Sequence, residues 1–224
     1  MLDLTSPLAW LLGSPERLWR WSRGRWWSAA DSLKYLIMAH AGCERLAARL
    51  LEHRVVLVHG PITEDSAKLI IARMLFLEAS DPSSPIELWI HSPGGLVTAG
   101  FAIADAMAEV RCAVHTYCLS NAGGVAGMLL VAGARGHRFI DPAAQVGLTD
   151  VVLKDGRPHE TVEEMWELHR MRNLIAGQIA ANAPQDAGAV LDAMRKDMRV
   201  SSRALLDCGM VDQVRASLPE LEGW

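Results

Sequence analysis

Two glycine-rich turns, each placed between an apolar run and a helix-like segment, constrain the fold of this chain more than any other feature. The turns are residues 92–95 (Ser-Pro-Gly-Gly) and 121–124 (Asn-Ala-Gly-Gly), and helical patterns follow at 99–110 and 125–134. A strand that passes through glycines into a helix leaves backbone N–H groups without helical partners. Two such turns side by side would offer donors to a developing oxyanion. A Gly-Gly pair can also simply let strand and helix pack closely, and the turns alone leave both interpretations open.

The segments around these turns alternate between strand and helix patterns. Residues 55–58 form an apolar run, Thr63 is placed to cap the helix after it, and a second apolar run covers 86–90. Such alternation predicts an α/β fold with mainly parallel strands covered by helices. In the first helix, the apolar positions at helical spacing are Ala67, Ile70, Ile71, Met74, Leu75 and Leu77.

The second half of the chain predicts a short strand at 145–148 and a long helix. Thr161 and Glu164 form a capping box, and the helix they open runs to about Ala181. A second helix is predicted over 185–195. The apolar side of the long helix carries Met165, Leu168, Met171, Leu174, Ile175 and Ile179.

The chain resembles the proteolytic subunit of the Clp protease, within the ClpP/crotonase superfamily. The resemblance rests on the two turns, on residues 54–60 and 72–79, and on residues 201–214 (SSRALLDCGMVDQV); it covers roughly residues 45–215. It implies a spiral of βαβ units and a strand-plus-long-helix handle by which two rings interlock. Self-assembly into stacked rings is therefore expected.

The catalytic residues of the family are mostly missing here. The resemblance places Gly124 at the position of the nucleophilic serine, Thr149 at that of the histidine and Asp197 at that of the triad acid. Glycine has no nucleophile, and threonine cannot act as a general base near pH 7, so acyl transfer through a Ser–His–Asp triad is excluded at this site. The sequence predicts a proteolytically inactive, noncatalytic or regulatory subunit.

Four other residues are candidate substitutes for the missing groups. Ser120 precedes the second turn, and His91 precedes the first; His115 lies in the strand between them; Asp150 follows Thr149. Each also has an ordinary structural interpretation: Ser120 as a turn residue bonded to local backbone, and the histidines as structural side chains. Asp150, beside Thr149, is the spare acid of most interest, and the sequence leaves open whether it lines the cavity.

A second functional interpretation makes use of the backbone donors. Crotonase-type members of the superfamily hold an enolate or another oxyanion with paired N–H groups. Here the oxyanion hole would comprise Gly94, Gly95 and Val125, with Asp150, His91 or Thr149 handling protons. The substrate would be a small molecule or an acyl compound, which the sequence does not name.

Composition limits the possible partners. The net charge of −4 predicts no general attraction to nucleic acid. The four cysteines form no C-x-x-C pair and have no zinc-site spacing, which is typical of reduced thiols in a cytoplasmic protein. No cofactor and no metal are predicted. The expected partners are copies of the chain or an active paralogue. The resemblance also implies docking of an AAA+ unfoldase. Trp89 would then lie in the cleft that receives the unfoldase, unless it packs in the core.

Residues 1–27 differ from the rest, which divides into a Clp-like domain at 28–216 and a tail at 217–224. Five of the eight tryptophans fall in this segment, interleaved with four arginines. Its apolar stretch is far shorter than the roughly 20 residues of a membrane span. The mixture suits a membrane surface or a partner groove, and the alternative is a poorly ordered or subunit-packing extension.

Overall fold

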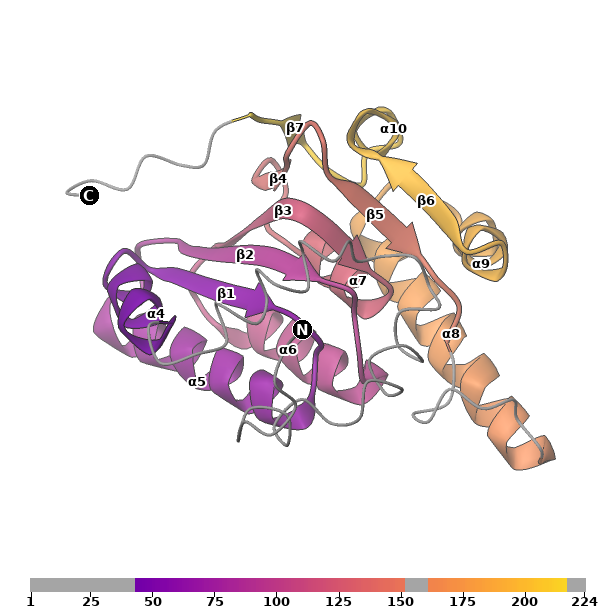
Figure 1. Ribbon diagram of the computed structural model, residues 1–224, viewed down its shortest axis with the longest axis horizontal. Helices are drawn as coiled ribbons and strands as arrows, with labels where there is room; N and C mark the ends of the chain where they lie inside the picture. The colour runs from indigo at the N-terminus through magenta and orange to yellow at the C-terminus, as the bar shows by residue number, and fades with distance from the viewer. Residues whose placement is uncertain (1–42, 152–160, 217–224) are drawn as a thin grey trace, which may run out of the picture. The chain divides into compact units, whose positions relative to one another are not determined.

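The computed structural model describes residues 43–151 and 161–216 (Figure 1). The chain divides into two units, Met1–Cys43 and Glu44–Trp224. The Trp/Arg-rich segment 1–27 and the C-terminal tail lie outside the described residues. No helix among those described is long and apolar enough to cross a membrane.

A mostly parallel seven-stranded sheet forms the centre of the second unit, as predicted. Its main path runs β1-β2-β3-β4-β7; β5 continues the sheet from the end of β3, and β6 pairs antiparallel with β5. The strands are β1 (Val55–His59), β2 (Ile86–Ser92), β3 (Val114–Gly123), β4 (Arg138–Ile140), β5 (Gln145–Leu148), β6 (Met198–Ser201) and β7 (Gln213–Val214).

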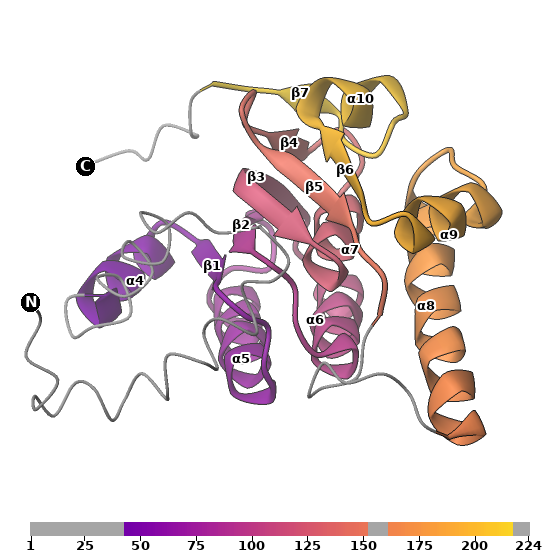
Figure 2. The same ribbon diagram turned by 45° about the vertical axis from the view of Figure 1, so that its right-hand side comes forward.

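Helices cover the sheet as the βα alternation requires. Helices α5, α6 and α7 lie against one face, while α8 runs beside α7 and extends past the sheet at its N-terminal end (Figures 1 and 2). The helices are α4 (Cys43–Glu52), α5 (Glu64–Ser80), α6 (Val97–Glu109), α7 (Val125–Val131), α8 (Val162–Asn182), α9 (Ala187–Arg195) and α10 (Ser202–Asp207).

The two predicted helix starts are confirmed by their caps. The Thr63 hydroxyl accepts the Ser66 N–H and the Ser66 side chain accepts the Thr63 N–H. Thr161 and Glu164 make the same reciprocal pair at the start of α8. Each pair satisfies amide groups that a helix start leaves without partners.

The core has two clusters, one on each face of the sheet. The larger lies between the sheet and α5, α6 and α7. The smaller joins Leu50 of α4 to Val55, Trp89, Tyr117 and Phe139. Trp89 is only 6% exposed, which confirms that it packs in the core.

Two predicted apolar faces are wrong in part. Leu75 is 49% exposed, because it follows the fully buried Met74 and successive side chains point about 100° apart around a helix. Leu174 is 43% exposed for the same reason, beside the buried Ile175. The C-terminal half of α8 buries Ile175, Ala176 and Ile179, and its first turns bury no side chain.

Candidate functional site

The turn between β3 and α7 has the geometry of a nucleophile elbow without a nucleophile. Gly124 has φ 49° and ψ −119°, and its N–H donates to the Gly147 carbonyl at 2.8 Å. Glycine adopts this conformation readily, whereas a residue with a side chain would be strained there. In hydrolases such a sharp strand-to-helix turn exposes the attacking serine. The elbow is therefore present and its side chain is missing.

Thr149 lies directly against Gly124. A Cβ built on Gly124 would be 3.0 Å from Thr149 Oγ1, and apart from its chain neighbours no other atom of residues 43–151 and 161–216 would lie within 4 Å of it. The contact follows from the parallel pairing of β3 with β5, which places Gly123 opposite Gly147. The structure thus brings the two predicted positions together and leaves open space at Gly124.

The first glycine turn packs on the second. A Cβ on Gly94 would lie 2.5 Å from the Gly123 carbonyl oxygen and 3.6 Å from the Val125 nitrogen. Ser92 Oγ accepts the Gly94 N–H at 3.1 Å and donates to the Gly60 carbonyl at 2.6 Å. Gly94 N–H therefore has a partner within its own turn.

The other two predicted donors are Gly95 and Val125. Within the part of the chain that the structure describes, neither N–H has a hydrogen-bond acceptor. Val125 is the first residue of α7, where an amide has no intrahelical partner. Two such amides, one on each of two packed glycine turns, are the kind of donor pair that an oxyanion hole requires.

Asp197 contacts the residue that follows Thr149. It has φ 47°, a left-handed conformation that aspartate tolerates, and follows the end of α9. Its Oδ1 accepts the Asp150 N–H at 3.0 Å. The predicted triad acid therefore contacts the backbone of the residue after Thr149.

Asp150 is engaged in an ion pair that the sequence did not predict. Its Oδ2 accepts from Arg172 Nη2 at 2.7 Å, and its Oδ1 accepts from Arg172 Nε. Oδ1 also accepts the Val151 N–H at 2.7 Å. The Asp150 carboxylate is thus bound on both oxygens, which leaves it poorly suited to the predicted role of a substitute acid. In the sequence, Arg172 could have been singled out only because it is a basic residue on the otherwise apolar side of this helix.

The remaining candidates lie elsewhere. His115 is the second residue of β3, and nine residues at about 3.3 Å each place it roughly 25–30 Å from Gly124. It bonds Glu87 at 2.8 Å and stacks on His137 with 4.0 Å between centroids. A structural role is therefore the better interpretation of His115.

His91 stacks on another imidazole, and Ser120 lies at the surface. The His91 ring stacks on His59 at 5.2 Å between centroids. Burial is the main reason why the pKa of His59 is lowered, and the charge of the nearby His91 lowers it further. Ser120 is exposed, and none of the described imidazoles is bonded to it.

Thiol and metal chemistry have little basis at this site. Burial raises the pKa of Cys118 to about 12, so the thiolate is scarce at neutral pH. Among residues 43–151 and 161–216, no three histidine, cysteine or acidic side chains are grouped to hold a metal ion.

A comparison with family models decides the relationship. The model of the Clp protease family matches residues 39–217, about four fifths of the sequence. The chain belongs to the Clp protease family. The match spans both glycine turns, α8 and the C-terminal segment. In this Clp protease family member the Trp/Arg-rich segment 1–27 precedes the matched region.

Proposed function

We propose that this Clp protease family member is a noncatalytic subunit of a Clp-type ring assembly. One observation carries the proposal: Thr149 Oγ1 is 3.0 Å from the place of a Gly124 side chain. The positions that need a nucleophile and a base are adjacent, and neither residue can fill its role. An oxyanion hole without an attacking group gives only residual catalysis.

Exposed apolar side chains on two helices support self-assembly. On α5, Leu69 is 51% and Phe76 60% exposed; on α8, Val162 is 60% and Trp166 67% exposed. Large apolar groups gathered on one helix are typical of surfaces that another protein covers. Family membership favours a second copy of the chain, or an active paralogue, as that protein.

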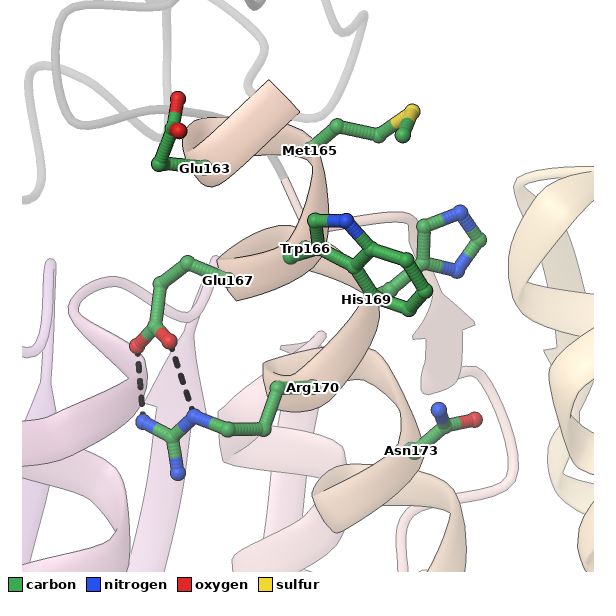
Figure 3. A pocket seen from close by; sticks show the side chains of 7 residues that line it. All are labelled: Glu163, Met165, Trp166, Glu167, His169, Arg170 and Asn173. Carbon is green, nitrogen blue, oxygen red and sulfur yellow. Dashed lines mark hydrogen bonds and ion pairs between the residues drawn. The ribbon is translucent and has the colours of Figure 1, made fainter. Parts of the chain in front are cut away.

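The N-terminal part of α8 has a charge pattern that suits pairing with a copy of itself. Glu163 and Arg170 lie three residues before and four residues after Trp166, and all three line an open hollow in which Arg170 also pairs with Glu167 (Figure 3). Residues at this spacing share one side of a helix. An isologous contact between two antiparallel copies, centred near Trp166, would place Glu163 of one copy opposite Arg170 of the other.

The proposal is tested by rebuilding the triad. We expect purified wild-type protein to cleave no peptide and to take up no active-site phosphonate label. The double variant Gly124→Ser with Thr149→His should be labelled, and Gly124→Ser alone should be labelled far more slowly because it lacks a base. Peptide cleavage by wild-type protein free of host protease would refute the noncatalytic assignment.

The assembly part of the proposal needs its own experiment. Co-expression with an active paralogue, with a different tag on each chain, should give mixed rings that survive tandem purification. Trp166→Ser should weaken them, while Gly177→Ala, also on α8 but away from the hollow, should not. If each tag instead purifies only rings made of its own chain, the proposal of a mixed ring is contradicted.

A second candidate function is favoured by the two amides without acceptors. The Gly95 and Val125 N–H groups, next to the space at Gly124, could hold the oxyanion of a small acyl substrate, as in crotonase-type enzymes. Turnover of a panel of acyl thioesters tests this function. Activity should disappear in Gly124→Val, which fills the space. Activity that is unchanged in that variant would place the chemistry elsewhere.

A further inference from the structure

Arg172 marks the point at which α8 leaves the body of the protein. It precedes the buried residues Ile175, Ala176 and Ile179 by three, four and seven positions, so it lies on the same side of the helix. On its N-terminal side, Leu168 and Met171 are only partly buried, and Trp166 is 67% exposed. Figure 2 shows this part of α8 extending away from the sheet. Apolar packing therefore holds the C-terminal half of α8 much better than its N-terminal half.

The partner of Arg172 belongs to the vacated site. Asp150 follows Thr149, which contacts Gly124, and the Asp150 N–H is held by Asp197 Oδ1 at 3.0 Å. The ion pair is partly shielded from water, with side-chain exposures of 13% for Arg172 and 30% for Asp150. Two parallel hydrogen bonds give such a pair a fixed geometry.

We propose that Arg172, Asp150 and Asp197 form an ionic strap that fixes the projecting half of α8 relative to the vacated site. The strap joins three segments: α8, the residues after β5 and the turn between α9 and β6. Asp197, at the acid position of the triad, serves here as an anchor for the backbone at Asp150. Arg172 is a positioning residue. When the pair opens, both the orientation of α8 and the position of Thr149 are released.

This inference rests on the proposed function in one respect, namely that the projecting half of α8 is the surface used in assembly. A change in α8 orientation would then change assembly, and contact at α8 would be transmitted to the residues beside Gly124. The strap itself is a property of one subunit and can be tested without any assembly.

Hydrogen exchange measured peptide by peptide tests the strap. In Arg172→Met, which keeps the apolar stem, amides of residues 163–172 should exchange about tenfold faster or more, since each hydrogen bond to a charged group is worth about one factor of ten or more. Amides of α5 should be unchanged. Arg203→Met is the matched control, because Arg203 makes an exposed ion pair with Asp207 within α10 and has no part in the proposed assembly contact. It should leave the exchange of α8 within about twofold.

Two further variants separate the strap from general destabilisation. Arg172→Lys keeps the charge but loses the paired hydrogen bonds, so its exchange should lie between wild type and Arg172→Met. The swap of Asp150→Arg with Arg172→Asp should restore part of the protection. Unchanged exchange in Arg172→Met would overturn the proposal. Equal acceleration in α5 and α8, in both Arg172→Met and Arg172→Lys, would also overturn it.

Sedimentation of the same variants keeps the two proposals apart. If wild-type protein stays monomeric both alone and with an active paralogue, and Arg172→Met still loosens α8, the strap stands and the assembly proposal fails. If wild-type protein assembles and Arg172→Met changes neither exchange nor assembly, the strap fails and the assembly proposal stands. Faster exchange in α8 together with weaker assembly supports both.

Discussion

Gly124→Ala tests whether the elbow is held in a conformation that only glycine accepts readily. The backbone there has φ 49° and ψ −119°, and a side chain in such a region costs about 1–3 kcal/mol. The added Cβ would also lie 3.0 Å from Thr149 Oγ1, so that hydroxyl must move by a few tenths of an ångström. For a chain of this size, about 2–4 °C is lost per kcal/mol. We therefore expect Gly124→Ala to lower Tm by about 2–12 °C.

The assay is thermal unfolding at one fixed protein concentration, because assembly makes Tm depend on concentration. Gly177→Ala is the matched control: Gly177 lies within α8, and beyond the backbone of that helix a Cβ there would meet no atom of the described residues within 4 Å. Alanine should stabilise that position by about 0.5–1 kcal/mol. Gly124→Ala combined with Thr149→Ala should recover only the steric part of the loss. An unchanged or higher Tm for Gly124→Ala would refute the argument from backbone strain.

Three other predictions concern the core. Arg138 is 4% exposed and donates hydrogen bonds to both carboxylate oxygens of Asp212. Arg138→Met should therefore lower the free energy of unfolding, measured by denaturant titration, by about 3–5 kcal/mol. Arg170→Met, which removes an exposed ion pair, should lower it by less than about 1 kcal/mol. Burial alone would raise the pKa of Asp212, but hydrogen bonds from the Arg138 side chain and backbone lower it overall. The resulting stability is present above the unfolded pKa of about 3.9 and is lost as pH falls through the folded pKa. In Asp212→Asn the free energy of unfolding should therefore fall less steeply as the pH is lowered. A fall as steep as in wild type would contradict this. Since burial raises the pKa of Cys118 to about 12, iodoacetamide at pH 8 should modify Cys118 only after unfolding, and rapid labelling of the native protein would count against its burial.

Much of the fold could be predicted because local patterns determined it. The alternation of apolar runs with helical patterns predicted parallel strands, and the Thr63 and Thr161 caps located two helix starts. The proximity of Gly124 and Thr149 was also predictable, since a resemblance that preserves spacing preserves the strand pairing that brings them together. These features depend on the order of residues along the chain.

The features that were not predicted depend on contacts between distant segments. Arg172 meets Asp150 across 22 residues and Asp197 meets it across 47, and no periodicity indicates either pairing. Strand β6 was missed because its four residues are mostly exposed and take strand form only by pairing with β5. The hydrogen bond from the Gly94 N–H to Ser92 Oγ likewise could not be predicted, because it depends on the three-dimensional shape of the turn.

Packing accounts for an elbow that persists without its catalytic residue. All seven residues of α7 are buried, and a Cβ on Gly100 would lie 2.0 Å from a Val125 methyl carbon. The Gly124 N–H is bonded to the β5 backbone. The turn is therefore held by α6, α7 and β5 whatever side chain it carries. A serine at residue 124 would be strained by about 1–3 kcal/mol, and glycine removes that cost. Glycine at residue 124 should thus stabilise the fold relative to serine, as expected where active sites are strained.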